Sequence, residues 1–226
     1  MKNESCDLNR CFLCNHCRPE WKELIALKKS TRRFKKGEQL FAEGESVAGI
    51  YFMNSGAVKV HKQWAGGKEL ILRFTKEGDI LGHRGLGGGE TYPVSATALE
   101  ETKACFIDSS FLEATLQTDS TFTYRLMHFY AAELQKAESR MRNLAMMEVK
   151  GRIADALLEL LTVFGTNKSK YISLPVNRQD IAAYAGTTYE TVFKFLRILI
   201  ASKTISVNGK SIRINDVEKL KSFITI

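Results

Sequence analysis

The chain has 226 residues, 44% of them hydrophobic and 26% charged, and its formal net charge is +8 at pH 7. This composition is that of a globular protein, and the length suffices for two domains with cores of their own. No stretch approaches the roughly 18 uninterrupted apolar residues that cross a bilayer, and the polar start lacks the apolar core of a signal peptide, so we expect a cytoplasmic protein without a membrane partner. From residue 150 onward, 12 Lys and Arg stand against 6 Asp and Glu. This surplus favours a polyanion as the partner of the C-terminal third.

The start of the chain is rich in cysteine. Four of the five cysteines are Cys6, Cys11, Cys14 and Cys17, and the fifth is Cys105. Thiols stay reduced in the cytoplasm, where clustered cysteines more often bind metal or carry redox chemistry than form structural disulfides. Residues 1–20 are therefore a candidate metal or redox segment.

Residues 37–108 consist of short β-rich runs separated by glycines, such as GIYFMNSG and ELILRFTKEGD. Strands this short, with turn signals at near-regular spacing, predict an antiparallel barrel or jelly roll. The period changes at Ser110, because Ser110 and Glu113 have the spacing of a capping box whose serine is the N-cap of a helix.

A long helix is predicted over residues 121–147, which contain neither Gly nor Pro. Its apolar residues step by three and four, as in a heptad seam: Met127, Tyr130, Leu134, Ala137, Met141 and Leu144. Such a stripe can pack on its own domain or on a second helix. The length of the helix and its charged flanks, Glu133, Lys136, Glu138 and Arg140, favour a dimer interface. A second amphipathic helix follows, and Gly165 is its expected C-cap.

The segment that begins at Arg178 has the spacing of a helix-turn-helix. Counted from Arg178, a small residue, Ala182, stands at the fifth position and Gly186 at the ninth, where the turn is tight. The apolar positions of the small core are Ile181, Ala185, Val192 and Phe195. Asn177 is the expected cap of the first helix and Thr187 that of the second.

A β-hairpin is predicted directly after these two helices. The run TISVNGKSIRI places Asn208 and Gly209 together, the pair favoured in a two-residue type I′ turn. A helix-turn-helix followed by a hairpin is typical of a winged helix. Together with the local positive charge, it predicts that the C-terminal part binds double-stranded DNA.

These motifs resemble the regulators named after the cyclic-AMP receptor protein and the fumarate and nitrate reduction regulator, the CRP/FNR family. The resemblance runs from about residue 22 to residue 214, and its strongest anchors are GRIADALLEL, RQDIAAYAGTTYETVFKFL and the glycine-marked β region. It implies an α+β fold with a cyclic-nucleotide-binding-like β-roll (double-stranded β-helix) over 21–118, a dimerisation helix over 119–147 and a winged helix-turn-helix over 148–226. It further implies a homodimer on a palindromic operator, with RNA polymerase as a candidate partner.

The same resemblance identifies candidate DNA contacts at the start of the second helix of the motif. They are Thr188, Tyr189, Glu190 and Lys194, with Arg197 one turn further on and Arg178 on the first helix. A carboxylate can accept a hydrogen bond from cytosine N4, and a cationic side chain can donate hydrogen bonds to guanine. Lys194 replaces the family's usual Arg, and since it lacks the bidentate fork, base discrimination there should be weaker or different. Glu190 has a second interpretation, as the capping-box partner of Thr187. Lys150, Arg152, Lys203 and Lys210, like Arg178, are expected to contact phosphates or solvent.

The resemblance argues against cyclic AMP as the effector. Relatives that bind the nucleotide use a Glu for the ribose and an Arg before a Ser for the phosphate, but here His83 and Val94 stand at those positions, the latter before Ser95. A buried phosphate without its cation would cost several kcal/mol. The effector pocket, if any, is therefore unknown.

In the oxygen-sensing branch, three N-terminal cysteines and one from the β-roll hold a 4Fe-4S cluster, and Cys105 falls at the position of the latter. Cys11, Cys14 and Cys17 have a spacing that allows one loop to present successive thiolates, although this branch usually has a wider second gap. Cys6 is a possible substitute for one of them. The rival interpretations are a zinc site that uses Cys6 or His16, a reversible disulfide, and an incidental tail beside a buried Cys105.

Three functions remain open at this point. The first is a dimeric DNA-binding regulator that responds to redox state through an iron-sulfur cluster. The second is the same regulator governed by a zinc or thiol switch, or by a small molecule other than cyclic AMP. The third is an enzyme, of the cupin kind or a thiol oxidoreductase; the predicted barrel lacks the clustered His and Glu of a cupin metal site, and no C-x-x-C precedes a βαβ pattern.

Overall fold

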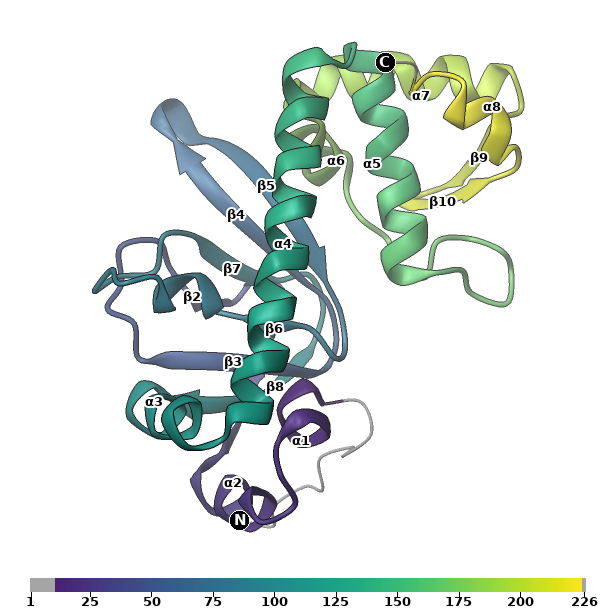
Figure 1. The fold of residues 1–226 in the computed structure, drawn as a ribbon. Helices are drawn as coiled ribbons and strands as arrows, with labels where there is room; N and C mark the ends of the chain where they lie inside the picture. The colour runs from purple at the N-terminus through teal and green to yellow at the C-terminus, as the bar shows by residue number, and fades with distance from the viewer. Residues whose placement is uncertain (1–10, 225–226) are drawn as a thin grey trace. The chain divides into compact units, whose positions relative to one another are not determined.

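The computed structural model of the chain describes residues 11–224, which form two compact units (Figure 1). The first unit comprises the chain up to Lys62 together with Thr75–Leu134, and the second comprises Gln63–Phe74 together with the chain from Gln135 onward. Among the described residues, no helix has both the length and the apolar character required to cross a membrane.

The first unit is built on a β-roll of two antiparallel sheets. One sheet has the strand order β1 (Ser30–Phe34), β8 (Thr102–Asp108), β3 (Gly49–Ser55), β6 (Ile80–Leu81), and the other β2 (Gln39–Phe41), β7 (Ser95–Ala98), β4 (Val58–Trp64), β5 (Lys68–Thr75). The last residues of β4 and most of β5, joined by the 3-10 turn η1 (Ala65–Gly67), belong to the second unit. The predicted jelly-roll architecture is confirmed.

Helices cover the outer face of the β3–β8 sheet. They are α1 (Phe12–His16), α2 (Trp21–Lys28), α3 (Ser109–Thr118) and the first half of α4 (Ser120–Met146), as Figure 1 shows. Side chains alternate along a strand, so Phe52 and Cys105 face these helices while Tyr51 and Phe106 face the interior of the roll. Both faces of β8 are therefore buried.

Helix α3 begins earlier than the sequence predicts. Its N-cap is Asp108, whose carboxylate accepts a hydrogen bond from the Phe111 amide at 2.9 Å, and the Ser110 hydroxyl donates to the same carboxylate. The predicted capping box of Ser110 and Glu113 is wrong, because the carboxylate that ends β8 is already placed to cap the helix.

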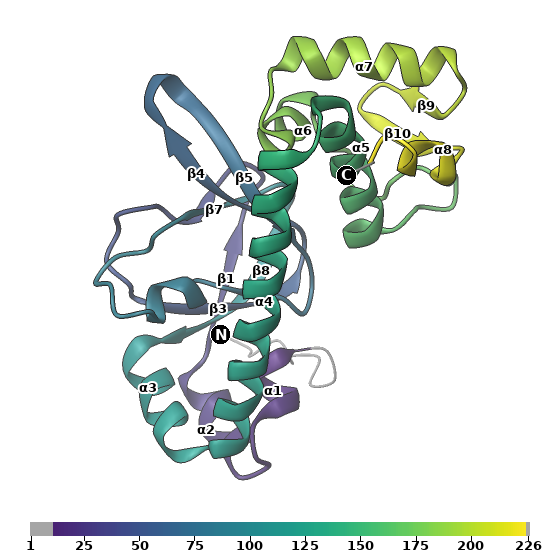
Figure 2. The same cartoon turned by 45° about the horizontal axis from the view of Figure 1, so that its top comes forward.

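The second unit contains the end of α4 followed by four helices and two strands that form the predicted winged helix-turn-helix. These are α5 (Val149–Phe164), α6 (Arg178–Ala185), α7 (Tyr189–Ala201), the hairpin of β9 (Ile205–Asn208) and β10 (Ser211–Ile214), and then the short α8 (Val217–Lys221). Gly165 ends α5 as predicted, with φ 63°. Figure 2 shows α7 beside the hairpin, which it contacts through β9.

The hairpin turn differs by one residue from the sequence prediction. Asn208 pairs with Ser211, so the two loop residues are Gly209 and Lys210, and of these only Gly209 has a positive φ, 59°. A type I′ turn needs positive φ at both central residues. The predicted type I′ turn centred on Asn208 and Gly209 is therefore wrong, since the strand pairing extends to Asn208.

Candidate nucleic-acid interface and cysteine site

The helix-turn-helix core is formed by the residues that the spacing predicts. Ile181, Ala182, Ala185, Val192 and Phe195 are all buried. Asn177 caps α6, its side-chain oxygen accepting from the Asp180 amide at 2.7 Å. Gly186 ends α6 in the left-handed region, at φ 59° and ψ 46°, and a Cβ there would lie 3.1 Å from Leu144 Cδ2. Glycine is thus suited to this turn both by its backbone conformation and by its size.

The cap of α7 is Thr188 and not Thr187. The Thr188 hydroxyl accepts from the Thr191 amide at 3.3 Å, whereas the Thr187 amide donates to Ala182 O and so still belongs to the end of α6. Thr187 and Glu190 therefore do not form a capping box. Hydrogen bonds from its own backbone amide and from the Thr188 hydroxyl lower the pKa of the exposed Glu190 carboxyl, which keeps it an ionised acceptor at neutral pH.

The candidate DNA contacts share one exposed surface. Thr188, Tyr189, Glu190, Lys194 and Arg197 are exposed at the start and middle of α7, and Arg178 at the start of α6 is partly exposed. A helix with an ionised acceptor and two cations on its outer face has the donor and acceptor types that base edges and phosphates require. We call the exposed residues Thr188–Arg197 the reading face.

Not every predicted phosphate contact faces outward. Arg152 on α5 donates to the carbonyl oxygens of Ala185 and Met147, both at 2.9 Å, and to that of Leu144. Carbonyl oxygens at the ends of α6 and α4 lack helical partners, and the guanidinium supplies donors for them. Arg152, predicted to contact phosphate or solvent, thus uses its side chain to hold the ends of these helices.

A groove of about 220 Å³ lies between α6, α7 and the hairpin in the second unit. It is lined by Val176, Asn177, Arg178, Gln179, Tyr189, Val207, Gly209, Lys210 and Ile212. The cationic side chains of Arg178 and Lys210 thus line this groove next to the reading face. A phosphate of the duplex backbone placed there would be near two positive charges.

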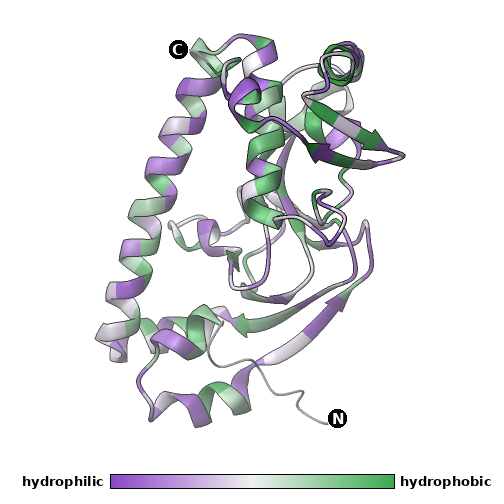
Figure 3. Ribbon diagram, turned by 90° about the vertical axis from the view of Figure 1, so that its right-hand side faces the viewer, coloured by the Kyte–Doolittle hydropathy of each residue, from purple (hydrophilic) through white to green (hydrophobic). Residues whose placement is uncertain are grey.

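The heptad seam of α4 is largely exposed within the chain. Met127, Leu134 and Met141, spaced by seven residues, are 57%, 61% and 65% exposed. Tyr130 differs, since its hydroxyl donates to His83 O in the β-roll. Figure 3 shows hydrophobic and hydrophilic residues alternating along α4. Two of the charged residues predicted to flank the seam interact within the chain instead. Glu133 is buried. The Arg140 guanidinium stacks on the Tyr184 ring at 3.6 Å and lies 3.9 Å from an Asp155 oxygen.

The three N-terminal cysteines in the described part of the chain flank and form α1. Cys11 is its N-cap, Cys14 lies within it and Cys17 is its C-cap; the Asn15 amide donates to Cys11 O at 2.9 Å. A spacing of three residues is close to one helical turn, so a helical segment brings the three side chains toward one side. The sequence prediction had a loop here, whereas the structure has a helix of five residues. Cys6 lies outside the described residues.

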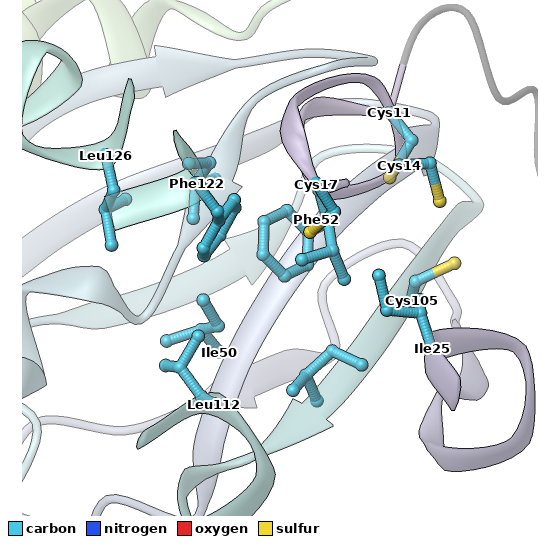
Figure 4. Packing of buried hydrophobic residues seen from close by; sticks show 13 residues of the cluster. Cys11, Cys14, Cys17, Ile25, Ile50, Phe52, Cys105, Leu112, Phe122 and Leu126 are labelled. Carbon is cyan, nitrogen blue, oxygen red and sulfur yellow. The ribbon is translucent and has the colours of Figure 1, made fainter. Parts of the chain in front are cut away.

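Cys105 lies opposite α1, although 88 residues separate it from Cys17. It stands on β8, paired with Thr31 of β1 and Phe52 of β3, and its side chain is on the helix-covered face. Cys11, Cys14, Cys17 and Cys105 are all buried and belong to one apolar cluster with Ile25, Leu112 and Phe122 among others. Figure 4 shows the four thiols gathered between α1 and β8. We call these four residues the cysteine cluster.

The cysteine cluster keeps at least one of its thiols neutral. Burial raises the pKa of Cys17 to about 12, and the negative charges of Asp119 and Cys11 act in the same direction, while Lys22 opposes them. A thiolate is the form that binds metal, and a bound metal ion supplies the positive charge that stabilises it. Among residues 11–224, no group of three or more His, Cys, Asp or Glu side chains is arranged to hold a metal ion, so the cluster is a set of candidate donors and not a formed site. His16, the alternative zinc ligand, packs edge-on against Phe12 with ring centroids 4.6 Å apart.

Asp119 is the residue of this region that sequence reasoning missed. Its side chain is fully buried and accepts from the Phe122 amide at 3.0 Å, which caps α4, and from the Arg18 amide at 2.9 Å. The Arg18 guanidinium lies 3.8 Å from the same carboxylate. One carboxylate therefore joins the end of the cysteine segment to the start of the long helix. The Asp before Ser120 in the sequence is a helix-cap signal that could have indicated it.

Aromatic rings fill the interior of the β-roll. The Phe41 ring stacks on Tyr92 at 4.2 Å and on Tyr51 at 5.8 Å, and the Tyr92 hydroxyl donates to Gly49 O. Val94 and His83 are both buried, and the His83 ring packs against Phe129 of α4 at 5.0 Å. Val94 therefore offers no cation to a cyclic phosphate at the position where nucleotide-binding relatives have an arginine.

Comparison with known proteins agrees with this architecture. A family model described as a cyclic nucleotide-binding domain matches residues 31–119, and one described as a Crp-like helix-turn-helix domain matches residues 151–223. The transcriptional activator protein FnrA of Stutzerimonas stutzeri is 30% identical over 190 residues, which cover 83% of this chain and 78% of that protein. The CRP-like cAMP-activated global transcriptional regulator of Mycobacterium tuberculosis is 29% identical over 189 residues, 83% of this chain and 84% of that protein. The structure of FixK2 from Bradyrhizobium japonicum superimposes with a TM-score of 0.78 at 27% identity, covering 88% of this chain and 98% of that one.

A cyclic-nucleotide-binding-like β-roll, a long helix and a winged helix-turn-helix define the class of protein, a DNA-binding transcription regulator and not an enzyme. The identity with FnrA over most of both chains makes the relationship specific. The chain belongs to the CRP/FNR family of transcription regulators, whose members are typically dimers. The relatives include both FnrA and a cAMP-activated regulator at nearly equal identity, so membership alone leaves the cofactor undecided.

Proposed function

We propose that this regulator responds to redox state through a 4Fe-4S cluster held by Cys11, Cys14, Cys17 and Cys105. The observation that carries the proposal is the convergence of four buried cysteines from two distant segments in one cluster. Four thiolates are the usual ligand set of such a cluster, which when bound supplies positive charge to them and a centre that oxygen can destroy. Because its DNA partner is in the cytoplasm, the protein acts there.

The contacts around α1 support a link from the cysteine segment to α4. Phe12 packs edge-on against Phe122 and Phe129, with centroids 6.0 and 5.6 Å apart, and Arg18 is held by the Asp119 carboxylate. A cysteine segment that is ordered by its ligands would keep these contacts, and one that is released would lose them. The position of α4 in the dimer is then the two-state element that the redox signal biases.

Metal analysis of full-length protein that is purified and kept anaerobic tests this proposal. We expect a brown protein with about four Fe per chain, which loses both its colour and its DNA affinity in air. Colourless anaerobic protein with unchanged DNA binding would contradict it, and one zinc per chain would favour the zinc alternative. A disulfide formed in air without any metal would favour the thiol switch.

Single and double replacements of Cys14 and Cys105 show whether the two segments act as one site. We expect Cys14→Ser and Cys105→Ser each to abolish most of the iron, and the double variant to be no worse than either, because ligands of one cluster are not additive. Cys6→Ser serves as the matched control. Full iron in that variant supports the proposed set, whereas loss of iron would replace one member of the set with Cys6.

We also propose that the reading face meets the major groove of a palindromic operator and that α4 pairs with its copy in a homodimer. An ionised Glu190 beside Lys194 supports this, since the two offer an acceptor and a donor to base edges. In binding assays with selected duplexes, Glu190→Gln and Lys194→Ala should relax base preference at one position each. Lys210→Ala should weaken all duplexes equally and reduce the salt dependence of binding.

Cyclic AMP is not the effector in this proposal. The valine before Ser95 supports this, because it supplies no cation at the position where nucleotide-binding relatives have an arginine, and the Phe41–Tyr92 stack occupies part of the roll interior. Isothermal titration of the full-length protein with cyclic AMP should give no saturable heat at millimolar nucleotide. A micromolar dissociation constant would contradict this part.

A further inference from the structure

Two exposed aromatic rings stand on the reading face of α7. Tyr189 and Phe193 are 41% and 39% exposed, one helical turn apart, with ring centroids 6.4 Å apart and planes within 13° of parallel. The Arg178 guanidinium lies 5.5 Å from the Phe193 centroid. We call Tyr189 and Phe193 the aromatic pair. It carries an apolar surface on the side of the helix where Glu190, Lys194 and Arg197 are also exposed.

The core of the motif does not require the aromatic pair. The apolar residues of α7 that are buried in that core are Val192, Phe195, Leu196 and Leu199, all of which are 3% exposed or less. The exposed part of these two rings is apolar surface whose burial against a partner would be favourable. Stacked rings with a cation beside them also have few rotamers to lose on binding, so they form a rigid contact surface.

The chemistry of the major groove identifies what such a surface would contact. Among the groups that base pairs expose there, the C5 methyl of thymine is the apolar one, and apolar side chains, Phe among them, pack against it. Cations beside the pair, Arg178 and Lys194, match the phosphates that flank any such base. We infer that the aromatic pair reads a thymine methyl in each half of the operator, an inference that rests on the proposed binding of α7 in the major groove.

The test uses the methyl group itself. Full-length anaerobic protein selects duplexes from a randomised pool, and the enriched palindrome is resynthesised with each thymine in turn replaced by uracil in both halves. Burial of one methyl corresponds to about a fourfold change in affinity, so the loss at one thymine position should be about fifteenfold for the symmetric site. Phe193→Ala protein should bind the thymine and uracil duplexes equally well.

Ile200→Ala is the matched control, because Ile200 is an apolar residue of α7 with a similar exposure of 41%, seven residues further along. This variant should keep the wild-type ratio between the two duplexes. Thermal unfolding shows whether Phe193→Ala is folded, and the uracil series with the wild-type protein stands whether it is or not.

The outcomes separate the two proposals. Uracil duplexes that all bind within twofold of the parent would overturn the inference, while a relaxed preference of Glu190→Gln in the same assay would leave the proposed groove binding intact. A methyl effect that persists in both Phe193→Ala and Tyr189→Ala would also overturn it. If the wild-type protein enriches no duplex, the proposed sequence reading fails, and the inference fails with it.

Discussion

At the residue scale, the carboxylate of Asp119 shows how one buried charge serves several neighbours. It accepts from the Phe122 amide, accepts from the Arg18 amide and lies near the Arg18 guanidinium. Together with burial, which is the larger cause, it also raises the pKa of Cys17. A fully buried carboxylate is tolerated only where donors compensate it, and here the start of α4 and the residue after Cys17 supply them. The same charge opposes ionisation of the nearest thiol.

Replacement of Asp119 by Asn should make Cys17 more reactive in metal-free protein. Removal of the negative charge lowers the pKa of the thiol, and the amide oxygen can still accept from the Phe122 amide, so α4 stays capped. The rate at which iodoacetamide alkylates Cys17, followed by mass spectrometry between pH 8 and 10, should rise. Asp108→Asn, which alters the cap of α3 by the same chemistry, is the control, and an unchanged pH profile for Asp119→Asn would contradict the expectation.

Cys17 should also make the metal-free protein less stable at alkaline pH. The folded state raises the thiol pKa from 9.0 to about 12, chiefly through burial, whereas the unfolded chain ionises at the ordinary value. The stabilisation is complete below pH 9 and is lost as the pH rises toward 12, because the unfolded state releases its proton first. Urea midpoints of the wild-type protein should therefore fall between pH 9 and 11 more steeply than those of Cys17→Ser. Parallel curves would count against this assignment.

At the element scale, the start of α7 illustrates how the preceding helix determines the cap of the next. The Thr187 amide donates a hydrogen bond to Ala182 O at the end of α6, so the turn between the helices includes Thr187 and α7 begins one residue later. By sequence, either threonine could be the N-cap, because the hydroxyl of each could accept a hydrogen bond from the amide three residues later. The structure decides between them, because the Thr187 amide is bonded to α6 and the Thr188 hydroxyl accepts from the Thr191 amide.

The two threonines should respond differently to replacement. Thr188→Ala removes the hydroxyl that accepts from the Thr191 amide and should cost about 1 kcal/mol of unfolding free energy, as helix N-caps do. Thr187→Ala is the matched control and should cost clearly less, because its hydroxyl does not cap α7. Urea denaturation of the full-length variants measures both, and an equal or reversed order would favour the sequence-based assignment of the cap.

At the scale of the whole molecule, α4 is where the dimer is expected to form. The row Met127, Leu134 and Met141 repeats every seven residues and exposes more than half of each side chain. A second helix with the same repeat would bury this row in a left-handed supercoil. The Tyr130 hydroxyl donates to the carbonyl of His83, so the β-roll and the seam meet at that residue.

Leu134→Glu should shift the protein from dimer to monomer. A carboxylate in the middle of an apolar helix interface loses its hydration without a partner, and two copies face each other there. Sedimentation velocity at micromolar concentration should show the change, accompanied by a large loss of affinity for a palindromic duplex. Gln135→Glu introduces the same charge at the neighbouring exposed residue and should stay dimeric; a dimeric Leu134→Glu would show that the interface lies elsewhere.

The sequence by itself determined the architecture, because each of its parts has a local pattern that can be recognised in the sequence. Period-two runs with glycine turns indicated the β-roll, the absence of Gly and Pro indicated α4, and the small residues Ala182 and Gly186 at their fixed spacing indicated the helix-turn-helix. Asn177 was assigned correctly as a cap since no competing residue precedes α6. Each of these signals depends on neighbours within a few positions.

Tertiary structure alone decided which distant residues meet. The pairing of β8 with β1 and β3 puts Cys105 on the helix-covered face, and a shift of one residue would turn it into the roll. The face on which the Cys105 thiol lies is thus set by strand register, which depends on contacts across the whole sheet. The same holds for Asp119, whose role needs both Arg18 and the start of α4. It also holds for Arg152, whose guanidinium donates to the carbonyl of Ala185, 33 residues away. Local sequence has no means to specify such long-range pairings, because they are decided by which surfaces bury one another when the chain folds.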